Sequence, residues 1–234
     1  MTEKKKDIYI YDPSTYRDWV KSYQDNDDPL GWFEALYNGA QGDHTKVFWA
    51  DLEPNHYLVK WMDDNETNPV RKKAIVIGCG VGDDAEALSE RGYEVIAFDI
   101  SSAAIDLCKH RYPDTKVHYK VADLFNLPKE WQENFDLVFE CNTIQVLPGN
   151  YRILARNAMI SLIAPGGYIL VSCRSRNQGE LEDAIPLPLD HDEINGFCQE
   201  GNLKEVSFEA YDDNQTPPVP HFFACYQKMF NSAT

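Results

Sequence analysis

The segment from Ala74 to Asp84 constrains the fold of this chain more than any other part of the sequence. Its first four residues are apolar and mostly β-branched, which is typical of a buried parallel strand and too short for a helix. Glycines follow at positions 78, 80 and 82, and a helical pattern then runs to Arg91. Glycine permits a positive φ and lets backbone and ligand approach closely. With a second strand that ends in Asp99, the segment predicts the βαβ start of a nucleotide-binding fold.

The spacing of these glycines separates two classes of cofactor. Dinucleotide-binding proteins favour Gly-x-Gly-x-x-Gly, and the following helix N-terminus receives a pyrophosphate. This chain has Gly-x-Gly-x-Gly followed by Asp83 and Asp84. Two acids would repel a pyrophosphate but could hold an ammonium group, which favours S-adenosylmethionine. Acids at a helix N-terminus are also favourable without any ligand, so both interpretations of Asp83 and Asp84 stay open.

Composition excludes several classes of function. The chain has 234 residues, 22 Lys+Arg against 38 Asp+Glu, and a formal net charge of -16. Such a surface repels phosphate backbones and anionic lipid, so we expect neither a nucleic-acid nor a membrane partner. No apolar stretch is long enough to span a bilayer. The six cysteines are widely spread without a Cys-x-x-Cys pair, which favours reduced thiols in a cytoplasmic protein and no metal site.

The order of predicted elements indicates two parts. Residues 1–70 form an aromatic-rich helical cap segment, and residues 71–234 form one α/β core. Within the core, helix 151–163 ends in Ala164-Pro165-Gly166-Gly167, and Asp190 with Glu193 predicts a capping box. The expected helices are 15–23, 30–38, 54–62, 103–110, 151–163 and 190–200, and the expected strands are 74–77, 94–98, 116–121, 135–140, 168–173, 203–211 and 222–228. The last two strands are expected to be an antiparallel pair.

From residue 70 to 228 this order resembles the class I S-adenosylmethionine-dependent methyltransferases. The resemblance rests on the glycine motif, the acid Asp99 after the second strand and the Pro-Gly-Gly before the fifth. It implies a Rossmann-like, doubly wound, seven-stranded mixed sheet with an antiparallel C-terminal strand. The segment from Gly31 to Ala50 resembles the cap of the small-molecule branch, the thiopurine and halide methyltransferase-like enzymes.

The resemblance also implies roles for individual residues. Asp99 would accept hydrogen bonds from the ribose hydroxyls, and Asp123 from the adenine amino group. Glu140 either pairs with the cofactor ammonium or faces solvent. Family members usually carry an acid where this chain has Val76, so the ammonium contact must come from elsewhere, with Asp83 or Asp84 as candidates. The expected cofactor-binding residues are Trp32, Trp49, Gly78, Cys79, Gly80, Gly82, Asp84, Asp99, Ile100, Ala122, Asp123, Leu124, Glu140 and Cys141.

Methyl transfer from a sulfonium is an in-line displacement, in which the protein mainly aligns the reactants and excludes water. No catalytic residue is legible in the sequence. Arg174 and Arg176 could hold an anionic acceptor or belong to a solvated loop. The expected partner is a small-molecule acceptor and the expected product S-adenosylhomocysteine, in a monomer or weak dimer. The competing interpretations are a nicotinamide-dependent oxidoreductase and a non-catalytic S-adenosylmethionine-binding protein.

Overall fold

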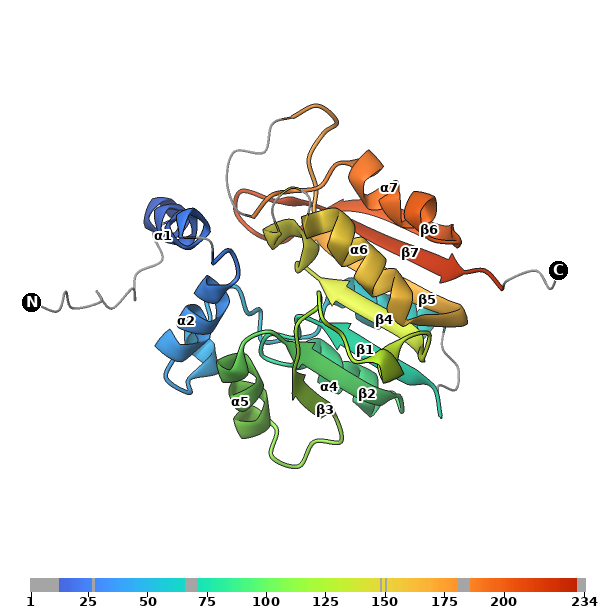
Figure 1. Cartoon of the computed structure of the whole chain (residues 1–234), viewed down its shortest axis with the longest axis horizontal. Coiled ribbons are helices and arrows are strands. Elements are labelled where there is room, and N and C mark those ends of the chain that lie inside the picture. The colour runs from blue at the N-terminus through green and yellow to red at the C-terminus, as the bar shows by residue number, and fades with distance from the viewer. Residues whose placement is uncertain are drawn as a thin grey trace, which may run out of the picture.

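The protein is built around one seven-stranded mixed sheet with the strand order β3-β2-β1-β4-β5-β7-β6 (Figure 1). This computed structural model describes residues 13–26, 28–65, 71–147, 149, 151–180 and 186–230. The strands are β1 (Lys73–Ile77), β2 (Glu94–Asp99), β3 (His118–Val121), β4 (Phe135–Cys141), β5 (Ile163–Arg174), β6 (Leu203–Asp212) and β7 (Pro220–Lys228). Strand β7 runs antiparallel to both of its neighbours, β5 and β6, whereas the other pairs in the described part of the sheet are parallel. The predicted fold class is confirmed.

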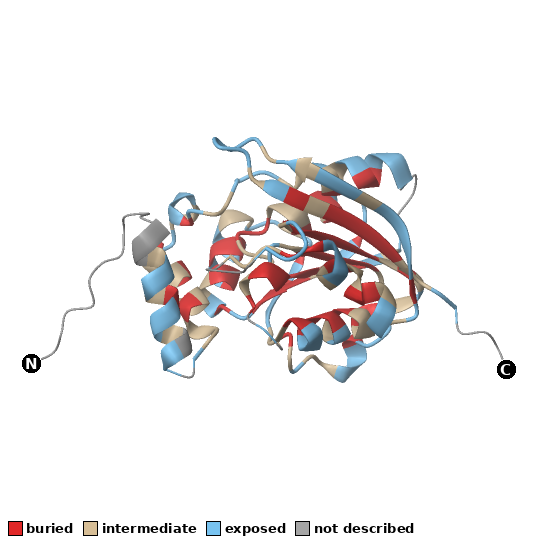
Figure 2. Cartoon of the chain, turned by 90° about the horizontal axis from the view of Figure 1, so that it is seen from above, coloured by how far each residue is buried: buried red, intermediate tan, exposed pale blue. Residues whose placement is uncertain are grey.

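Helices cover both faces of the sheet. They are α1 (Pro13–Asp25), α2 (Gly31–Gly39), α3 (His56–Asn65), α4 (Asp83–Glu90), α5 (Ser102–Arg111), α6 (Tyr151–Leu162) and α7 (His191–Glu200), with short 3-10 turns η1 (His44–Lys46), η2 (Lys129–Trp131) and η3 (Ile144–Val146). Apolar side chains of α6 and α7 pack on one face, and those of α3, α4 and α5 pack on the other. Figure 2 shows the buried residues concentrated in the sheet and on the inner sides of these helices.

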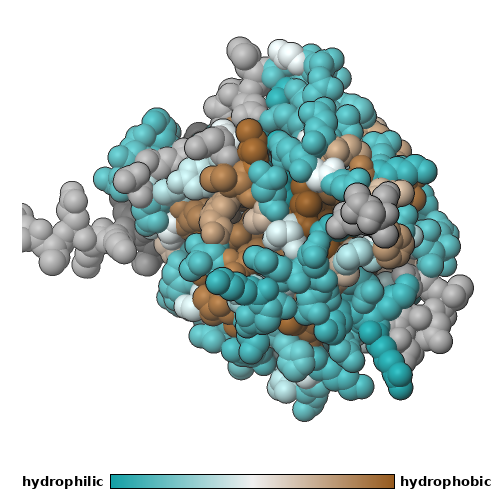
Figure 3. All heavy atoms as spheres, turned by 45° about the vertical axis from the view of Figure 1, so that its right-hand side comes forward, coloured by the Kyte–Doolittle hydropathy of each residue, from teal (hydrophilic) through white to brown (hydrophobic). Residues whose placement is uncertain are grey.

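The alternation of side chains along the central strands explains this two-sided core. In β1, Ile75 and Ile77 belong to the cluster under α6 and α7, whereas Ala74 and Val76 belong to the cluster under α3 and α4. All four are essentially without exposed surface. A strand buried on both faces needs apolar residues at every position, which is the continuous pattern that the sequence shows. Outside the core, Figure 3 shows hydrophilic residues over most of the face in view, with apolar residues near its middle.

The N-terminal helices divide between a cap and the core. Trp32 of α2 and Val20 of α1 form a separate aromatic cluster, and α1 and α2 lie beside the main body in Figure 1. Helix α3 belongs to the core instead of the cap, because its residues Leu58, Trp61 and Met62 pack against the sheet. From here on, the cap means residues 13–50. A domain boundary at residue 70 stays a prediction.

Several expected element boundaries were wrong, among them the starts of β5, α3 and β3. Strand β5 begins at Ile163 rather than at 168, because Ile163 pairs with Phe135 and the Pro-Gly-Gly run continues along β4 past a register shift. Helix α3 begins at His56 rather than at 54, because Asn55 accepts the backbone N–H groups of residues 57 and 58 through its side chain. Strand β3 begins at His118 rather than at 116. The capping box of Asp190 and Glu193 at the start of α7 is confirmed.

Two glycines give a matched test of backbone strain. Gly82 has φ +98°, and a Cβ there would lie 2.5 Å from the Tyr119 hydroxyl oxygen. Gly82→Ala should lower the free energy of unfolding by about 1–3 kcal/mol, because both the conformation and the space are unfavourable. A Cβ on Gly39, at the end of α2, would meet nothing within 4 Å. Gly39→Ala should therefore leave stability unchanged or slightly raised. Urea unfolding of both variants makes the comparison, and equal losses would contradict the argument.

Candidate functional site

The predicted site residues of the core meet at one edge of the sheet. Parallel pairing sets Ile77 opposite both Phe98 and Glu140, and Asp99 opposite Val121. The loops that follow β1, β2, β3 and β4 therefore leave the sheet side by side. In open α/β sheets this edge, at the carboxyl ends of the strands, is where ligands bind. The structure thus brings the glycine turn, Asp99, Ala122 and Cys141 to one place.

Asp99 links the glycine turn to the start of α5. Its Oδ2 accepts the backbone N–H of Gly80 at 3.1 Å, and its Oδ1 accepts that of Ser101 at 2.9 Å. The Cys79 N–H is bound to the carbonyl of Phe98. Asp99 is only 6% exposed, and this burial raises its pKa to about 6 despite the hydrogen bonds. Each carboxylate oxygen has a second lone pair, so the group can still accept bonds from a ligand diol.

Glu140 is a buried acid with an unsatisfied oxygen. Its Oε2 accepts the backbone N–H groups of Thr143 at 3.0 Å and of Ile144 at 3.2 Å. Its Oε1 is buried and has no hydrogen-bond partner within the described part of the chain. Burial raises the pKa of this carboxyl to about 8. Buried polar atoms in native proteins nearly always have partners, so an orphan at this edge indicates a group that a ligand would satisfy.

The two acids at the start of α4 have different roles. Asp83 forms an ion pair with Arg111, with 2.6 Å between Oδ2 and Nη1, so it fastens α5 to the glycine loop. Asp84 is half-buried, and its Oδ1 accepts the Asn55 backbone N–H at 2.7 Å. Burial raises the pKa of Asp84 to about 7. Of the two candidates for an ammonium ligand, only Asp84 is without an arginine partner among the described residues.

Asn55 is a site residue that the sequence did not reveal. Besides capping α3, its Nδ2 donates to the Ser172 hydroxyl at 3.2 Å and lies 3.5 Å from the Cys141 Sγ. Its backbone N–H reaches Asp84, as described above. One residue thus connects α3, α4, β4 and β5. An asparagine after a proline at a helix start was the available signal, but it predicts only a helix cap.

The residues expected around an adenine ring follow β2 and β3. Asp123 is half-buried and accepts the Phe125 N–H at 2.9 Å through Oδ1, which leaves Oδ2 without a described partner. Leu124 is 8% exposed and Ile100 is 38% exposed. The Ala122 N–H is bound to the Asp99 carbonyl. Their position beside Asp99 is compatible with the predicted roles, which stay predictions.

The cap is joined to this edge through α2. Glu34 accepts hydrogen bonds from the Ser101 hydroxyl at 2.6 Å and the Ser102 hydroxyl at 3.0 Å, at the N-terminus of α5. The Tyr37 hydroxyl lies 3.2 Å from the point where a Cβ on Gly80 would stand, and it accepts the Trp49 indole N–H at 3.3 Å. Neither Glu34 nor Tyr37 was predicted.

Trp32 and Trp49 differ in their access to the site. Trp49 is half-buried and reaches the glycine loop through Tyr37. Trp32 has no exposed surface, donates its indole N–H to the Pro29 carbonyl, and packs edge-on against Trp19 and Trp49. Trp32 therefore packs the cap in this structure, and its expected ligand contact stays a prediction that requires movement of the cap.

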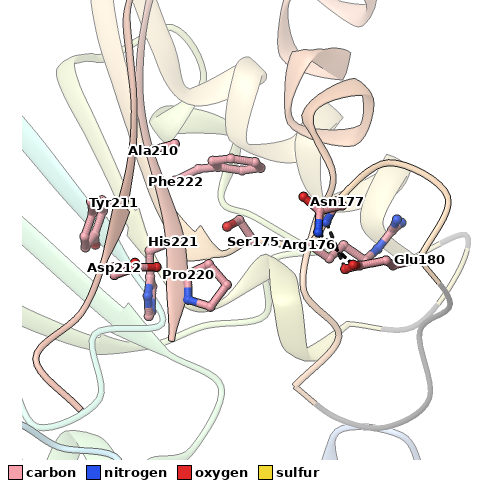
Figure 4. A pocket seen from close by; sticks show the side chains of 10 residues that line it. All are labelled: Ser175, Arg176, Asn177, Glu180, Ala210, Tyr211, Asp212, Pro220, His221 and Phe222. Atoms are coloured by element: carbon pink, nitrogen blue, oxygen red, sulfur yellow. Dashed lines mark hydrogen bonds between the residues drawn. The ribbon is translucent and has the colours of Figure 1, made fainter. Parts of the chain in front are cut away.

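A cavity of about 490 Å³ lies at the ends of β5, β6 and β7 (Figure 4). Its lining includes Ser175, Tyr211, His221 and Phe222. Because β6 and β7 run antiparallel, their loop-facing ends meet the carboxyl end of β5, so the cavity shares an edge with Glu140 and Asp84. Its volume suits a small organic molecule. No sequence pattern predicted this cavity, although Arg176, considered above for an anionic acceptor, is in its lining.

The described residues contain neither a cluster suited to a metal ion nor a helix suited to cross a membrane. Among the described residues, no group of three or more His, Cys, Asp or Glu side chains could hold a metal ion. In the same part of the chain, the helices are too short or too polar to cross a bilayer.

The sheet order and this ligand-binding edge define the fold of the class I S-adenosylmethionine-dependent methyltransferases. Comparison with known proteins agrees: residues 74–167 match the model of a family described as "Methyltransferase domain". The ubiquinone biosynthesis O-methyltransferase of Stutzerimonas stutzeri is 28% identical over 147 residues, 62% of each chain. That of Acinetobacter baylyi is 26% identical over 135 residues, 55% of this chain and 56% of the relative. The chain thus spans about three-fifths of the length of these relatives.

Solved structures extend the likeness beyond the matched segment. Magnesium protoporphyrin IX methyltransferase from Synechocystis, solved with S-adenosylhomocysteine, gives a TM-score of 0.67 at 13% identity, over 85% of this chain and 98% of that one. The 1,6-didemethyltoxoflavin-N1-methyltransferase of Burkholderia thailandensis gives 0.60 at 15% identity, over 94% and 92%. The latter coverage includes most of the N-terminal helices. Residues 74–167 are thus similar to a methyltransferase-domain family, and the described chain has the fold of the class I S-adenosylmethionine-dependent methyltransferases.

The buried acids predict an unusual pH dependence of stability. Glu140 holds its proton in the folded state up to about pH 8, whereas its ordinary pKa is 4.5. Between these values the folded state binds more protons than the unfolded state, so stability falls as pH rises through this window. The slope is at most about 1.4 kcal/mol per pH unit for each such group. The ligand-free protein should therefore melt at a lower temperature at pH 8 than at pH 6.

A substitution at Glu140 tests whether this residue causes the fall in stability between pH 6 and pH 8. Glu140→Gln should flatten the fall in melting temperature between pH 6 and pH 8, because glutamine does not ionise. Glu133→Gln is the matched control, since Glu133 is paired with Lys228, which lowers its pKa and moves its titration below the window. An unchanged slope in Glu140→Gln would contradict the interpretation.

Proposed function

We propose that the chain transfers a methyl group from S-adenosylmethionine to a small-molecule acceptor and releases S-adenosylhomocysteine. The observation that carries the proposal is the pair of buried acids, Asp99 and Glu140, on either side of the glycine turn. Asp99 accepts the Gly80 N–H of the turn and keeps lone pairs that could accept from a diol. Glu140 has a buried oxygen without a described hydrogen-bond partner, which could bind a cation. A nucleoside with an amino-acid end and no phosphate fits such a site, whereas a pyrophosphate would lie beside the carboxyl groups of Asp99 and Glu140.

The proposed contacts follow from the positions of these groups. Asp99 accepts from the ribose hydroxyls, and Asp123 accepts from the adenine amino group above Leu124. The Oε1 of Glu140 binds the ammonium group, and Asp84 contributes a second acid nearby. The glycine turn passes beneath the ligand, where any Cβ would obstruct it. Cys79, Cys141, Ile100 and Ala122 complete the proposed wall.

The bound cofactor would supply the activated methyl group, so the chain's residues have to orient the acceptor and exclude water. Tyr37 and Trp49 are suited to this work, because they lie above Gly80 and bring aromatic surface to the glycine loop. An aromatic face beside a sulfonium adds cation–π stabilisation of about 1 kcal/mol. No residue is assigned as a general base, since one is needed only for an acceptor that must lose a proton.

Small organic acceptors are the class that we propose. The support is the cavity at the ends of β5–β7 and the names of similar proteins, which refer to ubiquinone biosynthesis, a toxoflavin precursor and a magnesium porphyrin. Assignment to the thiopurine and halide branch stays a prediction. So do a cytoplasmic location and a monomer or weak dimer.

A labelled-methyl assay tests the function directly. The protein is incubated with methyl-tritiated S-adenosylmethionine and panels of thiol, phenol, amine and halide acceptors, and label in the organic phase is counted. Calorimetric titrations with S-adenosylhomocysteine and with NAD run in parallel. Preference for NAD would support the oxidoreductase instead, and cofactor binding without transfer to any acceptor would support a non-catalytic binding protein.

Asp99 gives a sharp test of cofactor binding. Asp99→Ala should weaken S-adenosylhomocysteine binding by about 1.5–3 kcal/mol, because a charge-assisted contact to the ribose is lost. Asp99→Asn should lose less, since one acceptor oxygen remains for the Gly80 N–H. Asp106→Ala, at an exposed position on α5, is the control and should bind normally. Isothermal titration gives the Kd values, and wild-type affinity in Asp99→Ala would refute the contact.

The raised pKa of Glu140 predicts that protons are released when S-adenosylhomocysteine binds. At pH 7 its carboxyl is mostly protonated, and an incoming ammonium lowers its pKa, so up to about one proton leaves. The binding enthalpy of S-adenosylhomocysteine should differ between phosphate and Tris buffers. The difference should equal the number of protons released multiplied by the difference between the ionisation enthalpies of the two buffers. Glu140→Gln should remove most of the difference, and Asp84→Asn should account for the remainder. The same proton count in Glu140→Gln and wild type would contradict the assignment.

A further inference from the structure

Arg174, at the carboxyl end of β5, is a partly buried cation without a counter-ion. It forms no ion pair or side-chain hydrogen bond among the described residues. Every other arginine of the described chain that is at least partly buried has a carboxylate partner: Arg111 with Asp83, Arg152 with Glu193, Arg156 with Glu200, and Arg176 with Asp190 and Glu193. In a chain with 38 acidic residues, an unpaired arginine at the ligand-binding edge requires an explanation.

The backbone holds Arg174 firmly in place. Its N–H donates to the Gln145 Oε1 at 2.6 Å, its carbonyl accepts the Leu189 N–H, and it lies opposite His221 in the antiparallel ladder. Gln145 is itself only 4% exposed. A rigid strand end is the kind of position from which a guanidinium can bind a ligand with defined geometry.

The alternation of β5 puts Arg174 on the same face as Ser172. The Ser172 hydroxyl is 3.2 Å from the Asn55 Nδ2 and 3.5 Å from the Tyr211 hydroxyl. The backbone N–H of Asn55 donates to Asp84, so Arg174 lies two residues along β5 from Ser172, which Asn55 connects to Asp84. The cavity of Figure 4 opens at the same strand ends; Arg174 is not one of its lining residues, but Ser175 and His221, its chain neighbour and its cross-strand neighbour, are.

We propose that Arg174 binds a carboxylate group of the methyl acceptor, an inference that rests on the proposed function. A guanidinium donates two parallel hydrogen bonds to a planar carboxylate, which sets the orientation of the ligand as well as its position. Arg176, two residues further, cannot share this role, because Asp190 and Glu193 already occupy its guanidinium.

The aromatic surroundings favour a planar acceptor. Tyr211 stacks on Tyr57 with 3.9 Å between ring centroids and on His221 with 5.3 Å. Phe223 lies on the same face, beside Tyr57. An aromatic acid meets both a fork of donors and apolar ring faces here, so benzoate is a suitable probe and benzamide is its neutral isostere.

The test measures benzoate and benzamide binding by calorimetry or ligand-observed NMR, to ligand-free protein and to protein saturated with S-adenosylhomocysteine. Benzoate should bind the wild type better than benzamide, and Arg174→Gln should weaken benzoate by at least about tenfold while S-adenosylhomocysteine binding stays within about twofold. Arg174→Lys should be intermediate, because it keeps the charge and loses the fork. Arg17→Gln, at an exposed position on α1, is the control and should behave as wild type.

Several results would overturn the assignment. These are equal benzoate binding in wild type and Arg174→Gln, no discrimination between benzoate and benzamide, or tighter binding of inorganic phosphate than of benzoate. Melting curves establish that each variant is folded. Failure of S-adenosylhomocysteine to bind the wild type would refute the cofactor proposal instead, and the titrations of ligand-free protein would still report on Arg174.

Discussion

The carboxylate of Asp99 is the constraint on which the arrangement of the site depends. The turn after β1 has left-handed backbone at Gly78, Gly80 and Gly82, and the N–H of Gly80 is bonded to an acceptor outside the turn. One carboxylate oxygen of Asp99 accepts the backbone N–H of Gly80, and the other accepts the backbone N–H of Ser101. The carboxylate therefore fixes two consecutive loops relative to each other. The cost is a buried acid whose pKa is raised, which a purely structural link could have avoided with a neutral side chain.

Local patterns predicted much of the fold because local chemistry determines it. The apolar run of β1, the glycine turn and the capping box of α7 each express a preference that few tertiary contacts oppose. The start of β5 was missed, because pairing of Ile163 with Phe135 overrides the turn preference of Pro-Gly-Gly. Boundaries of this kind depend on a partner strand nearly thirty residues away, and no local pattern records it.

The site was less predictable than the fold for the same reason. Asp83 and Asp84 are adjacent and chemically identical, yet one pairs with Arg111 and the other with the Asn55 backbone. Arg174 and Arg176 are likewise indistinguishable in sequence, and only the packing of α7 shows which one is engaged. Asn55 could be expected to cap a helix, but its contacts with β4 and β5 come from residues 86 and 117 positions away. The sequence identifies candidates, and long-range packing divides them.

The attachment of α2 has a mechanical consequence. Glu34 is bonded to the start of α5, and Tyr37 stands over Gly80, so the cap is fastened to the two loops that Asp99 joins. Because α2 contacts both loops directly, a displacement of either loop would also displace α2. The ends of β5 and β7 carry no such connection to α2 among the described contacts. In the proposed arrangement, entry of the nucleoside is therefore coupled to motion of the cap, whereas entry of the acceptor beside Arg174 is not.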